Sequence, residues 1–237
     1  MSPHGPELFQ VSTLAALAHG ANRGGITIGQ LLAHGDLGIG TFDGLDGELV
    51  VLDGCAFRVT GHERVTPVAA DELTPYAAVT AFRAEVRSPL PPCADIGELT
   101  AALDGLRTDP DRVAAIRVDG RFERLGLRVA CGAREGETLA QAAGYQFEAH
   151  HAGVEATMVG FWTPEDLLGV DVVGYHLHVL SHDRTVGGHV FEASGSELTA
   201  RVQTEGRLHV VGEPAPQIDV EQLADDLGGS ERFRRAK

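Results

Sequence analysis

Short apolar runs alternate with turn-forming residues through the first quarter of the chain. Between residues 36 and 60, β-prone runs are separated by three Asp-Gly pairs, at residues 43–44, 46–47 and 53–54. Asp-Gly is favoured in tight hairpin turns because both residues tolerate a positive φ. The pattern therefore predicts antiparallel hairpins. The preceding segment, residues 24–35, is predicted to be a helix that ends at a glycine.

The middle of the chain combines one helical segment with further strand-like segments. Residues 75–86 predict a strand, and residues 96–108 carry apolar side chains at helical spacing. Residues 114–130 predict a β-hairpin that turns at Asp119-Gly120. Residues 131–145 are small and polar, which favours a linker between domains.

Strand-like segments then follow at regular intervals, at residues 154–162, 174–181, 187–193, 197–203 and 206–212. Such regularity is typical of a compact β-barrel or sandwich. We therefore expect an α+β fold in two parts. The first is an N-terminal mixed β-sheet domain with helices, over residues 1–131, and the second is a C-terminal β-rich, barrel-like domain, over residues 132–237.

The acidic composition limits which kinds of binding partner are expected. The 237 residues include 19 Lys and Arg against 34 Asp and Glu, a formal net charge of −15. An acidic surface repels phosphate backbones and anionic lipid, so we expect no nucleic-acid or membrane partner. No apolar run approaches the ~20 residues of a membrane-spanning helix. The N-terminus lacks a cationic segment before its apolar stretch, so it is not interpreted as a signal peptide, and the expected location is the cytoplasm.

The cysteines and lysines exclude two kinds of chemistry. Cys55, Cys93 and Cys131 are odd in number and far apart, which excludes a disulfide scaffold or a thiolate zinc site. The only lysine is the last residue, Lys237. Covalent catalysis through a Schiff base requires a lysine held in a pocket, and a C-terminal residue is poorly suited to that role.

A group of histidines in the C-terminal half predicts a metal site. His176 and His178 lie two apart in a strand-like segment, so both point to one face, roughly 6–7 Å apart. His189 lies on the predicted partner strand, and a hairpin would bring it opposite this pair. Three neutral imidazoles suit zinc or another late first-row divalent ion, and they leave positions open for water or substrate. Such a site is catalytic in type.

The neighbouring histidines are interpreted as structural or surface residues. His182 has a spacing compatible with a fourth ligand, but its presumed loop also holds Asp183 and Arg184, which favours a solvent-facing position. His150 and His151 adjoin the predicted linker and are expected at the surface.

Acid–base and charged groups are needed to complete such a site. Glu48 begins an apolar strand directly after a predicted turn. It is either a residue at the strand end on the surface or a functional residue, and the pattern alone favours the surface. Arg128 has the same ambiguity, and Arg117 and Arg124 are neighbouring alternatives that nothing in the pattern separates from it.

Two motifs resemble the α-acetolactate decarboxylase family. The segment from Gly153 to Phe191 contains GYHLHVLSHDRTVGGHV, which is similar to that family's signature in identity and spacing. GDLGIGTFDGLDGELVVLDG, from Gly35 to Gly54, resembles its N-terminal motif, and PYAAVTAF and FERLGLRVA occupy the positions of its intervening blocks. The resemblance covers most of the chain, from about Phe9 to His209.

The resemblance implies specific roles. His176, His178 and His189 match the zinc ligands, Glu48 a functional glutamate and Arg128 the active-site arginine. Thr41 and Leu45 match positions that line the substrate pocket. The family also uses a glutamate near its C-terminus, for which Glu231 is the nearest match and Glu221 the second choice. It further implies a homodimer, with an N-terminal mixed sheet that extends across the dimer and a C-terminal β-barrel that carries the histidines.

The implied reaction converts 2-acetolactate to (R)-acetoin and carbon dioxide. Decarboxylation of a β-keto acid needs a sink for electrons, and zinc is the natural substitute for a lysine because it stabilises an enediolate as a Lewis acid. Arg128 would hold the carboxylate or support the negative charge. Glu48 or the C-terminal glutamate would deliver the proton.

Two other classes compete with this interpretation. A cupin-like metal enzyme or small-molecule-binding β-barrel also uses a His-x-His pair, but it typically places a glutamate three or four residues later, where this chain has Ser181 and His182. A binding protein with a structural zinc normally has four protein ligands, often thiolates, and the cysteines here do not cluster with the histidines.

Overall fold

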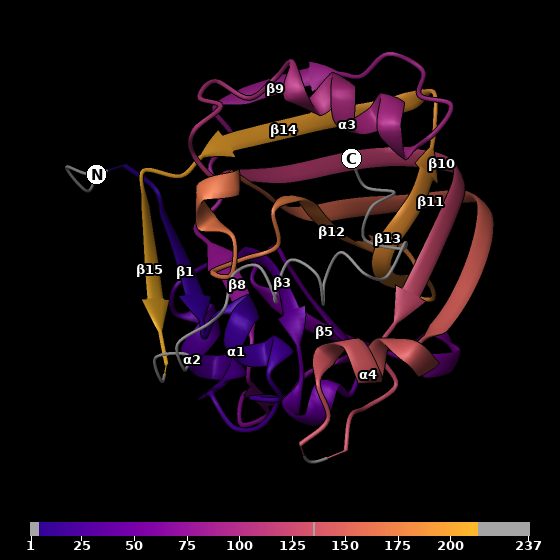
Figure 1. The fold of residues 1–237 in the computed structure, drawn as a ribbon. Coiled ribbons are helices and arrows are strands. Elements are labelled where there is room, and N and C mark those ends of the chain that lie inside the picture. Colours follow the sequence, from indigo (N-terminus) through magenta and orange to yellow (C-terminus); the bar gives the residue numbers. More distant parts are fainter. Residues whose placement is uncertain (1–4, 135, 213–237) are drawn as a thin grey trace.

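The computed structural model describes residues 5–134 and 136–212, and it consists mostly of β-structure in two large sheets (Figure 1). The first sheet has seven strands in the order β15-β1-β8-β3-β4-β5-β6. Only β1 and β15 are parallel, so the sheet is mixed, as predicted. Its strands are β1 (Glu7–Val11), β3 (Leu37–Thr41), β4 (Glu48–Leu52), β5 (Cys55–Thr60), β6 (Arg64–Pro67), β8 (Ala77–Thr80) and β15 (Arg207–Val211).

The second sheet has six antiparallel strands in the order β11-β12-β13-β10-β14-β9, and β11 also pairs with β10. Its strands are β9 (Val86–Pro89), β10 (Ala114–Val129), β11 (Phe147–Thr163), β12 (Gly174–Ser181), β13 (Gly187–Ser194) and β14 (Glu197–Thr204). A small two-stranded sheet joins β2 (Ile26–Thr27) to β7 (Leu73–Thr74). The predicted α+β class is therefore confirmed in its coarse form, as a mixed sheet, a separate second sheet and a few helices.

The helices are short and mostly begin at a side-chain cap. Thr13, Thr27, Asp95 and Thr138 each accept a hydrogen bond from a backbone N–H of the first turn. They precede α1 (Leu14–Ala18), α2 (Ile28–Leu32), α3 (Ile96–Asp104) and α4 (Leu139–Ala142). Single 3-10 turns complete the elements, at η1 (Asp43–Leu45), η2 (Gly61–Glu63), η3 (Ala143–Tyr145) and η4 (Glu165–Leu167). No helix of the described residues is long and apolar enough to cross a membrane.

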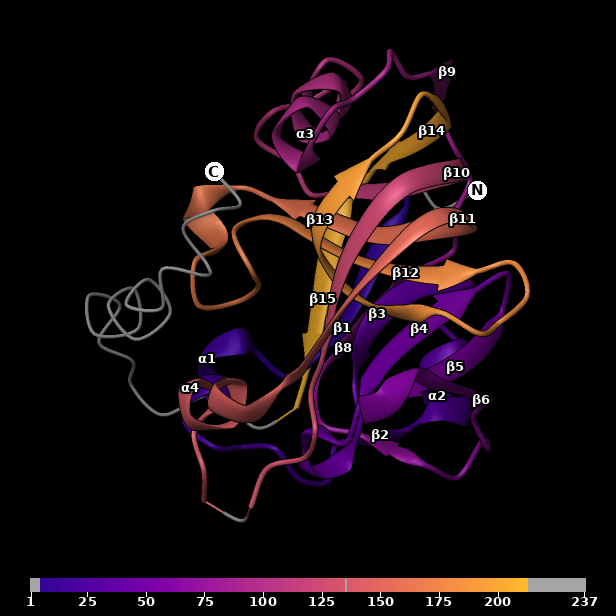
Figure 2. The ribbon, with the colours of Figure 1, turned by 90° about the vertical axis from the view of Figure 1, so that its right-hand side faces the viewer.

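A buried apolar layer joins the two sheets. Val50 and Val59 of the first sheet share one contact cluster with Ala115, Val159 and Leu180 of the second, and all five are fully buried. The sheets therefore pack against each other, while α3 covers the second sheet through Leu99 and Leu103 (Figure 2). Burial of this layer is the main driving force that brings residues of the two sheets together.

The predicted hairpin at Asp119-Gly120 is wrong. Residues 114–129 form one continuous strand, β10, which pairs with β11 along its length. Gly120 has a φ of +147°, and a Cβ there would collide with the backbone oxygen of Glu197 in β14. The glycine therefore permits a close approach of two strands, and it does not form a turn.

Other expectations hold in part. Asp53-Gly54 forms the predicted tight turn between β4 and β5, with positive φ at both residues. Residues 24–35, predicted to be one helix, contain the two-residue strand β2 followed by the short helix α2. Residues 75–86, predicted to be one strand, contain β8, which ends at Thr80. Residues 131–145 include the short helix α4, and their role as a linker between domains stays a prediction.

Sheet membership does not follow the predicted division at residue 131. β9 and β10 precede that residue but belong to the second sheet, whereas β15 follows it and pairs with β1 of the first. The two-domain boundary itself stays a prediction.

Candidate metal centre

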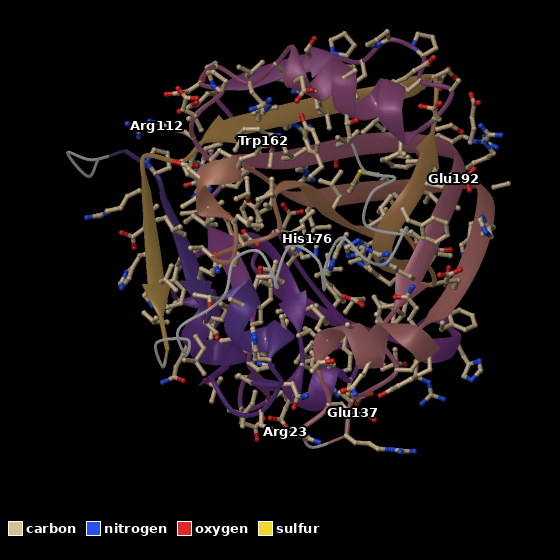
Figure 3. The ribbon with its side chains drawn as sticks, in the orientation of Figure 1. Arg23, Arg112, Glu137, Trp162, His176 and Glu192 are labelled. Atoms are coloured by element: carbon tan, nitrogen blue, oxygen red, sulfur yellow. The ribbon has the colours of Figure 1, made fainter. Side chains whose placement is uncertain are left out.

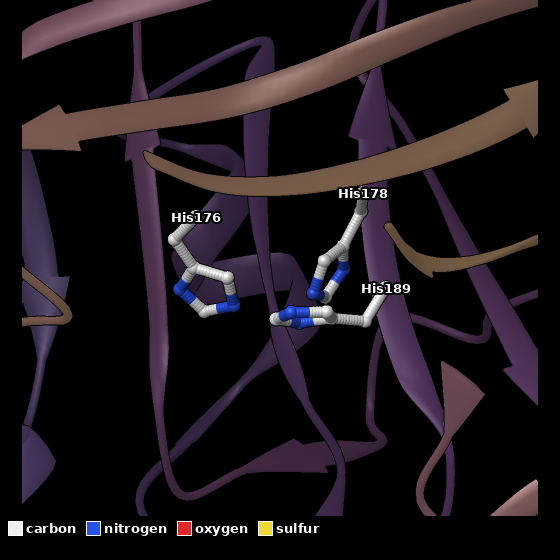
Figure 4. A group of neighbouring side chains, drawn as sticks. All are labelled: His176, His178 and His189. Atoms are coloured by element: carbon white, nitrogen blue, oxygen red, sulfur yellow. The ribbon is translucent and has the colours of Figure 1, made fainter. Parts of the chain in front are cut away.

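Three imidazoles come together on the β12–β13 hairpin. His178 pairs directly with His189 across the hairpin, and His176 projects from the same face of β12 (Figure 4). One ring nitrogen of each histidine lies within 4.8 Å of the others, and the ring centroids are 5.0 to 5.3 Å apart. His176 lies near the centre of the molecule, whereas Arg112 and Glu192 lie at its periphery (Figure 3). The two-residue period and the hairpin therefore bring together the three histidines that the sequence singled out.

The histidine cluster fits a divalent cation. Nδ1 of His178 lies 2.9 Å from the backbone oxygen of Leu49, which only accepts hydrogen bonds, so Nδ1 carries the proton. Nε2 of His178 then has a free electron pair, and it is buried with no hydrogen-bond partner among the described residues. A buried acceptor left without a donor is costly unless a cation occupies its lone pair.

Burial also keeps the three imidazoles neutral, which is the form that binds metal. Desolvation lowers the pKa of His178 to about 4, although its hydrogen bond to Leu49 acts in the opposite direction. Desolvation also lowers the pKa of His176 and of His189, and the nearby charge of Arg128 adds to the effect at both.

Glu48 reaches this cluster from the first sheet. Its Oε1 accepts a hydrogen bond from the N–H of Ala130 at 2.9 Å, and its Oε2 lies 3.5 Å from Nε2 of His178. Burial raises the pKa of Glu48 to about 7, partly offset by the Ala130 hydrogen bond and by Arg128. The surface position favoured by the sequence pattern is therefore wrong, because docking of the two sheets covers the start of β4.

Of the three arginines that the sequence left open, the structure brings Arg128 to the histidines. It pairs with His189 across β10 and β13, and its Nη2 lies 2.8 Å from Nε2 of His189. Arg117 instead forms ion pairs with Asp53 and Asp119. Arg124 bonds the backbone oxygen of Ala94 and belongs to the exposed side of the strand.

A cavity of about 320 Å³ opens beside the cluster. Glu48, Arg128, His176 and His189 line it, so these charged and ligating groups share one cavity. A structural zinc site would be closed by protein ligands, whereas this cluster adjoins a space for a small molecule.

The two residues that the resemblance implied for the pocket also line this cavity. Thr41 is buried, and its hydroxyl donates to the backbone oxygen of Gly47 at 2.8 Å. Leu45 lies in η1 with a positive φ of 55°. Glu231 and Glu221 lie outside the described residues.

Sequence reasoning missed much of the cavity wall. Tyr76 and Ala142 line the cavity, and the buried Tyr76 hydroxyl donates a hydrogen bond to the buried carboxylate of Asp171. Burial raises the pKa of both Tyr76 and Asp171. No sequence pattern links these two, because they are 95 residues apart. Of the other histidines predicted at the surface, His150 and His182 are exposed, whereas His151 is half-buried.

The comparisons agree with the geometry. The family model of alpha-acetolactate decarboxylase matches residues 8–217. The alpha-acetolactate decarboxylase of Lactococcus lactis subsp. lactis is 41% identical over 221 residues, which cover 93% of this chain and 92% of that protein. The enzyme of the same name from Bacillus licheniformis is 31% identical over 205 residues, which cover 86% of this chain and 81% of that protein.

Solved structures extend the likeness to the fold. The crystal structure of alpha-acetolactate decarboxylase from Bacillus subtilis strain 168 matches with a TM-score of 0.86 and 26% identity, covering 93% of this chain and 98% of that one. A Staphylococcus aureus protein described as similar to alpha-acetolactate decarboxylase matches with a TM-score of 0.88 and 29% identity, covering 98% of this chain and 100% of that one. This chain therefore belongs to the alpha-acetolactate decarboxylase family.

Proposed function

We propose that the protein is a metal-dependent decarboxylase that converts 2-acetolactate to (R)-acetoin and carbon dioxide. One observation carries the proposal most strongly. Three neutral imidazoles converge with an arginine and a protonatable carboxylate, and four of these five side chains line one cavity. The matching relatives are named alpha-acetolactate decarboxylase.

His176, His178 and His189 would hold the metal ion. All-imidazole ligation without thiolates favours zinc or another late first-row divalent ion. When bound, such an ion supplies positive charge that draws electron density from the ketone and hydroxyl oxygens of the substrate. The histidines themselves present neutral nitrogens, because burial keeps them unprotonated near neutral pH.

Arg128 would bind the substrate carboxylate or support the negative charge that develops on the substrate oxygens. Its guanidinium is permanently charged and lies at the rim of the histidine cluster. Because the protein carries a net charge of −15, this local positive charge is what attracts an anionic substrate.

Glu48 would supply the proton that replaces carbon dioxide. The bond between the carboxylate and its carbon breaks, its electron pair stays with the substrate, and the proton on the Glu48 carboxyl is transferred to that carbon. The N–H of Ala130 fixes one oxygen of Glu48, and the other lies 3.5 Å from Nε2 of His178, beside the proposed metal site. Delivery from one side accounts for a single enantiomer of acetoin. Glu231 is proposed as a second acid, and Thr41 and Leu45 as substrate contacts.

The experiment measures acetoin and carbon dioxide formed from racemic acetolactate, before and after removal of metal by a chelator. The proposal expects turnover that is lost on chelation and restored by zinc. Undiminished turnover by metal-free protein would overturn the metal dependence, and a zinc-loaded protein inert to acetolactate would overturn the reaction. The homodimer and the cytoplasmic location stay predictions.

A further inference from the structure

The cavity wall has two chemically different parts. Glu48, Arg128, His176 and His189 form the charged and ligating part, while Thr41 and Gln146, which also line the cavity, donate to Gly47 and Glu148. The apolar part, here named the alkyl chamber, comprises Leu14, Leu17, Leu45, Tyr76, Leu139 and Ala142, which belong to one contact cluster. α1 and α4, which lie side by side in Figure 2, provide most of it. The charged part comes from the two sheets, and the apolar part comes from two short helices, η1 and Tyr76, which directly precedes β8.

The alkyl chamber is unsuited to an anion. Its residues include no cationic side chain. Its one hydroxyl, on Tyr76, already donates its proton to Asp171, and Asp171 also accepts the N–H of Val172 at 2.7 Å. A carboxylate placed there would lose its hydration without gaining a donor, which is costly. The carboxylate of a bound substrate therefore lies at the Arg128 end.

The position of the carboxylate at Arg128 determines where the opposite end of the substrate lies. In a 2-hydroxy-3-oxo acid, the alkyl group on the ketone carbon is the part farthest from the carboxylate. With the carboxylate at Arg128, that alkyl group faces the alkyl chamber. The cavity of about 320 Å³ falls within the range of sites for drug-sized ligands, so it exceeds what the small acetolactate molecule needs.

We propose that the alkyl chamber binds the alkyl group on the ketone carbon of the substrate, including groups longer than the methyl of acetolactate, and that Ala142 sets the length limit. The inference rests on the proposed function. Ala142 is 5% exposed and is the smallest side chain of the chamber, so any larger residue there extends into the space. Leu139, half-buried on the same helix, limits the chamber at a second position.

The test compares acetolactate with its propyl ketone homologue, and with the isomer that carries the propyl group on the carbinol carbon. Carbon dioxide release gives kcat/KM for each acid with the metal-loaded protein. One methylene group in an apolar pocket changes the ratio of the kcat/KM values of two substrates by about tenfold or more. We expect the propyl ketone to react within about tenfold of acetolactate and faster than its isomer.

Ala142→Leu is expected to lower kcat/KM for the propyl ketone by at least about tenfold relative to acetolactate, because leucine fills the space of the added carbons. Leu139→Ala is expected to act in the opposite direction and to favour the pentyl ketone. Ala33→Leu, at an exposed position beyond the end of α2 and outside the cavity wall, is the matched control and should leave all ratios unchanged.

The outcomes separate the two hypotheses. A protein that forms no acetoin from acetolactate refutes the proposed function. If acetolactate reacts but the propyl ketone does not, or if both substitutions change all substrates equally, the assignment of the alkyl chamber is refuted. If Ala142→Leu does not fold, Leu139→Ala still tests the length limit, since a shorter side chain there adds no steric clash.

Discussion

Oε2 of Glu48 lies 3.5 Å from Nε2 of His178, although Glu48 belongs to the first sheet and His178 to the second. A second contact ties the same elements together, because Nδ1 of His178 lies 2.9 Å from the backbone oxygen of Leu49. The face-to-face packing of the sheets thus sets the distance between the carboxylate and the imidazole cluster.

Glu48→Gln is expected to retain bound metal and to lower kcat by about a hundredfold or more, because the amide keeps the shape but has no acidic proton. The glutamine oxygen can still accept the N–H of Ala130, so the fold should be unchanged. Steady-state kinetics and metal analysis of the same preparation measure both effects. Glu197→Gln, at an exposed position in β14, is the control. An unchanged kcat in Glu48→Gln would remove Glu48 from the reaction.

His176→Ala is expected to lose stoichiometric zinc while keeping the β-sheet circular dichroism spectrum, because it removes a ligand from the wall of a cavity. His178→Ala should also lose zinc. In addition it should lower the free energy of unfolding by about 1–3 kcal/mol, since the buried oxygen of Leu49 then lacks its donor. His182→Ala, exposed in the turn after β12, serves as the control. Full zinc content in both variants would contradict the ligand assignment.

Local patterns predicted the centre of the histidine cluster well. His176 and His178 share a face because strand side chains alternate, and the short turn before β13 brings His189 opposite. Asp53-Gly54 likewise forms its turn because both residues adopt a positive φ. In each case a few neighbouring residues determine the geometry.

Contacts between distant segments could not be predicted in the same way. Asp119-Gly120 has the same composition as a turn, but β14 pairs beside it and keeps the chain extended. Glu48 resembles a surface residue until the second sheet covers it, and nothing along the chain pairs Tyr76 with Asp171. Such positions depend on tertiary packing, which overrides local preference.

Gly160→Ala is expected to weaken zinc binding and to lower the free energy of unfolding by about 2 kcal/mol or more. Gly160 has a φ of +156°, and a Cβ there would collide with the backbone oxygen of His176 on the paired strand. Urea denaturation and a zinc competition titration measure the two effects. Gly105→Ala, at the end of α3 where the nearest atom is 3.5 Å from the added carbon, should be neutral or slightly stabilising. Wild-type zinc affinity in Gly160→Ala would contradict this prediction, because it would mean that β12 can move away from β11 without disturbing the histidines.

Glu205 is expected to make stability depend on pH. Burial raises the pKa of Glu205 from 4.5 to about 7, despite hydrogen bonds from Gln203 and Thr80. Between pH 4.5 and about pH 7, Glu205 is ionised in the unfolded chain but keeps its proton in the folded protein. Stability from this group is therefore fully present below pH 4.5 and is lost as the pH rises to about 7.

Glu205→Gln isolates this effect, because the amide cannot ionise and still accepts from Gln203. The difference in unfolding free energy, wild type minus variant, should fall by up to about 3 kcal/mol between about pH 5 and about pH 8. Urea denaturation at both pH values measures it. The same difference for Glu197→Gln should stay constant. A constant difference for Glu205→Gln as well would mean that the folded protein ionises Glu205 normally.

The division of the site between two sheets has a practical consequence for anyone who purifies this protein. All three imidazoles lie on one hairpin, whereas the acid that faces them arrives only when the sheets dock. Because Leu49 of the first sheet also contacts Nδ1 of His178, both the imidazole cluster and its acid depend on how the two sheets dock. Under the proposed function, a change that loosens the packing of the sheets would disturb metal binding and turnover together, so both are best measured on the same preparation.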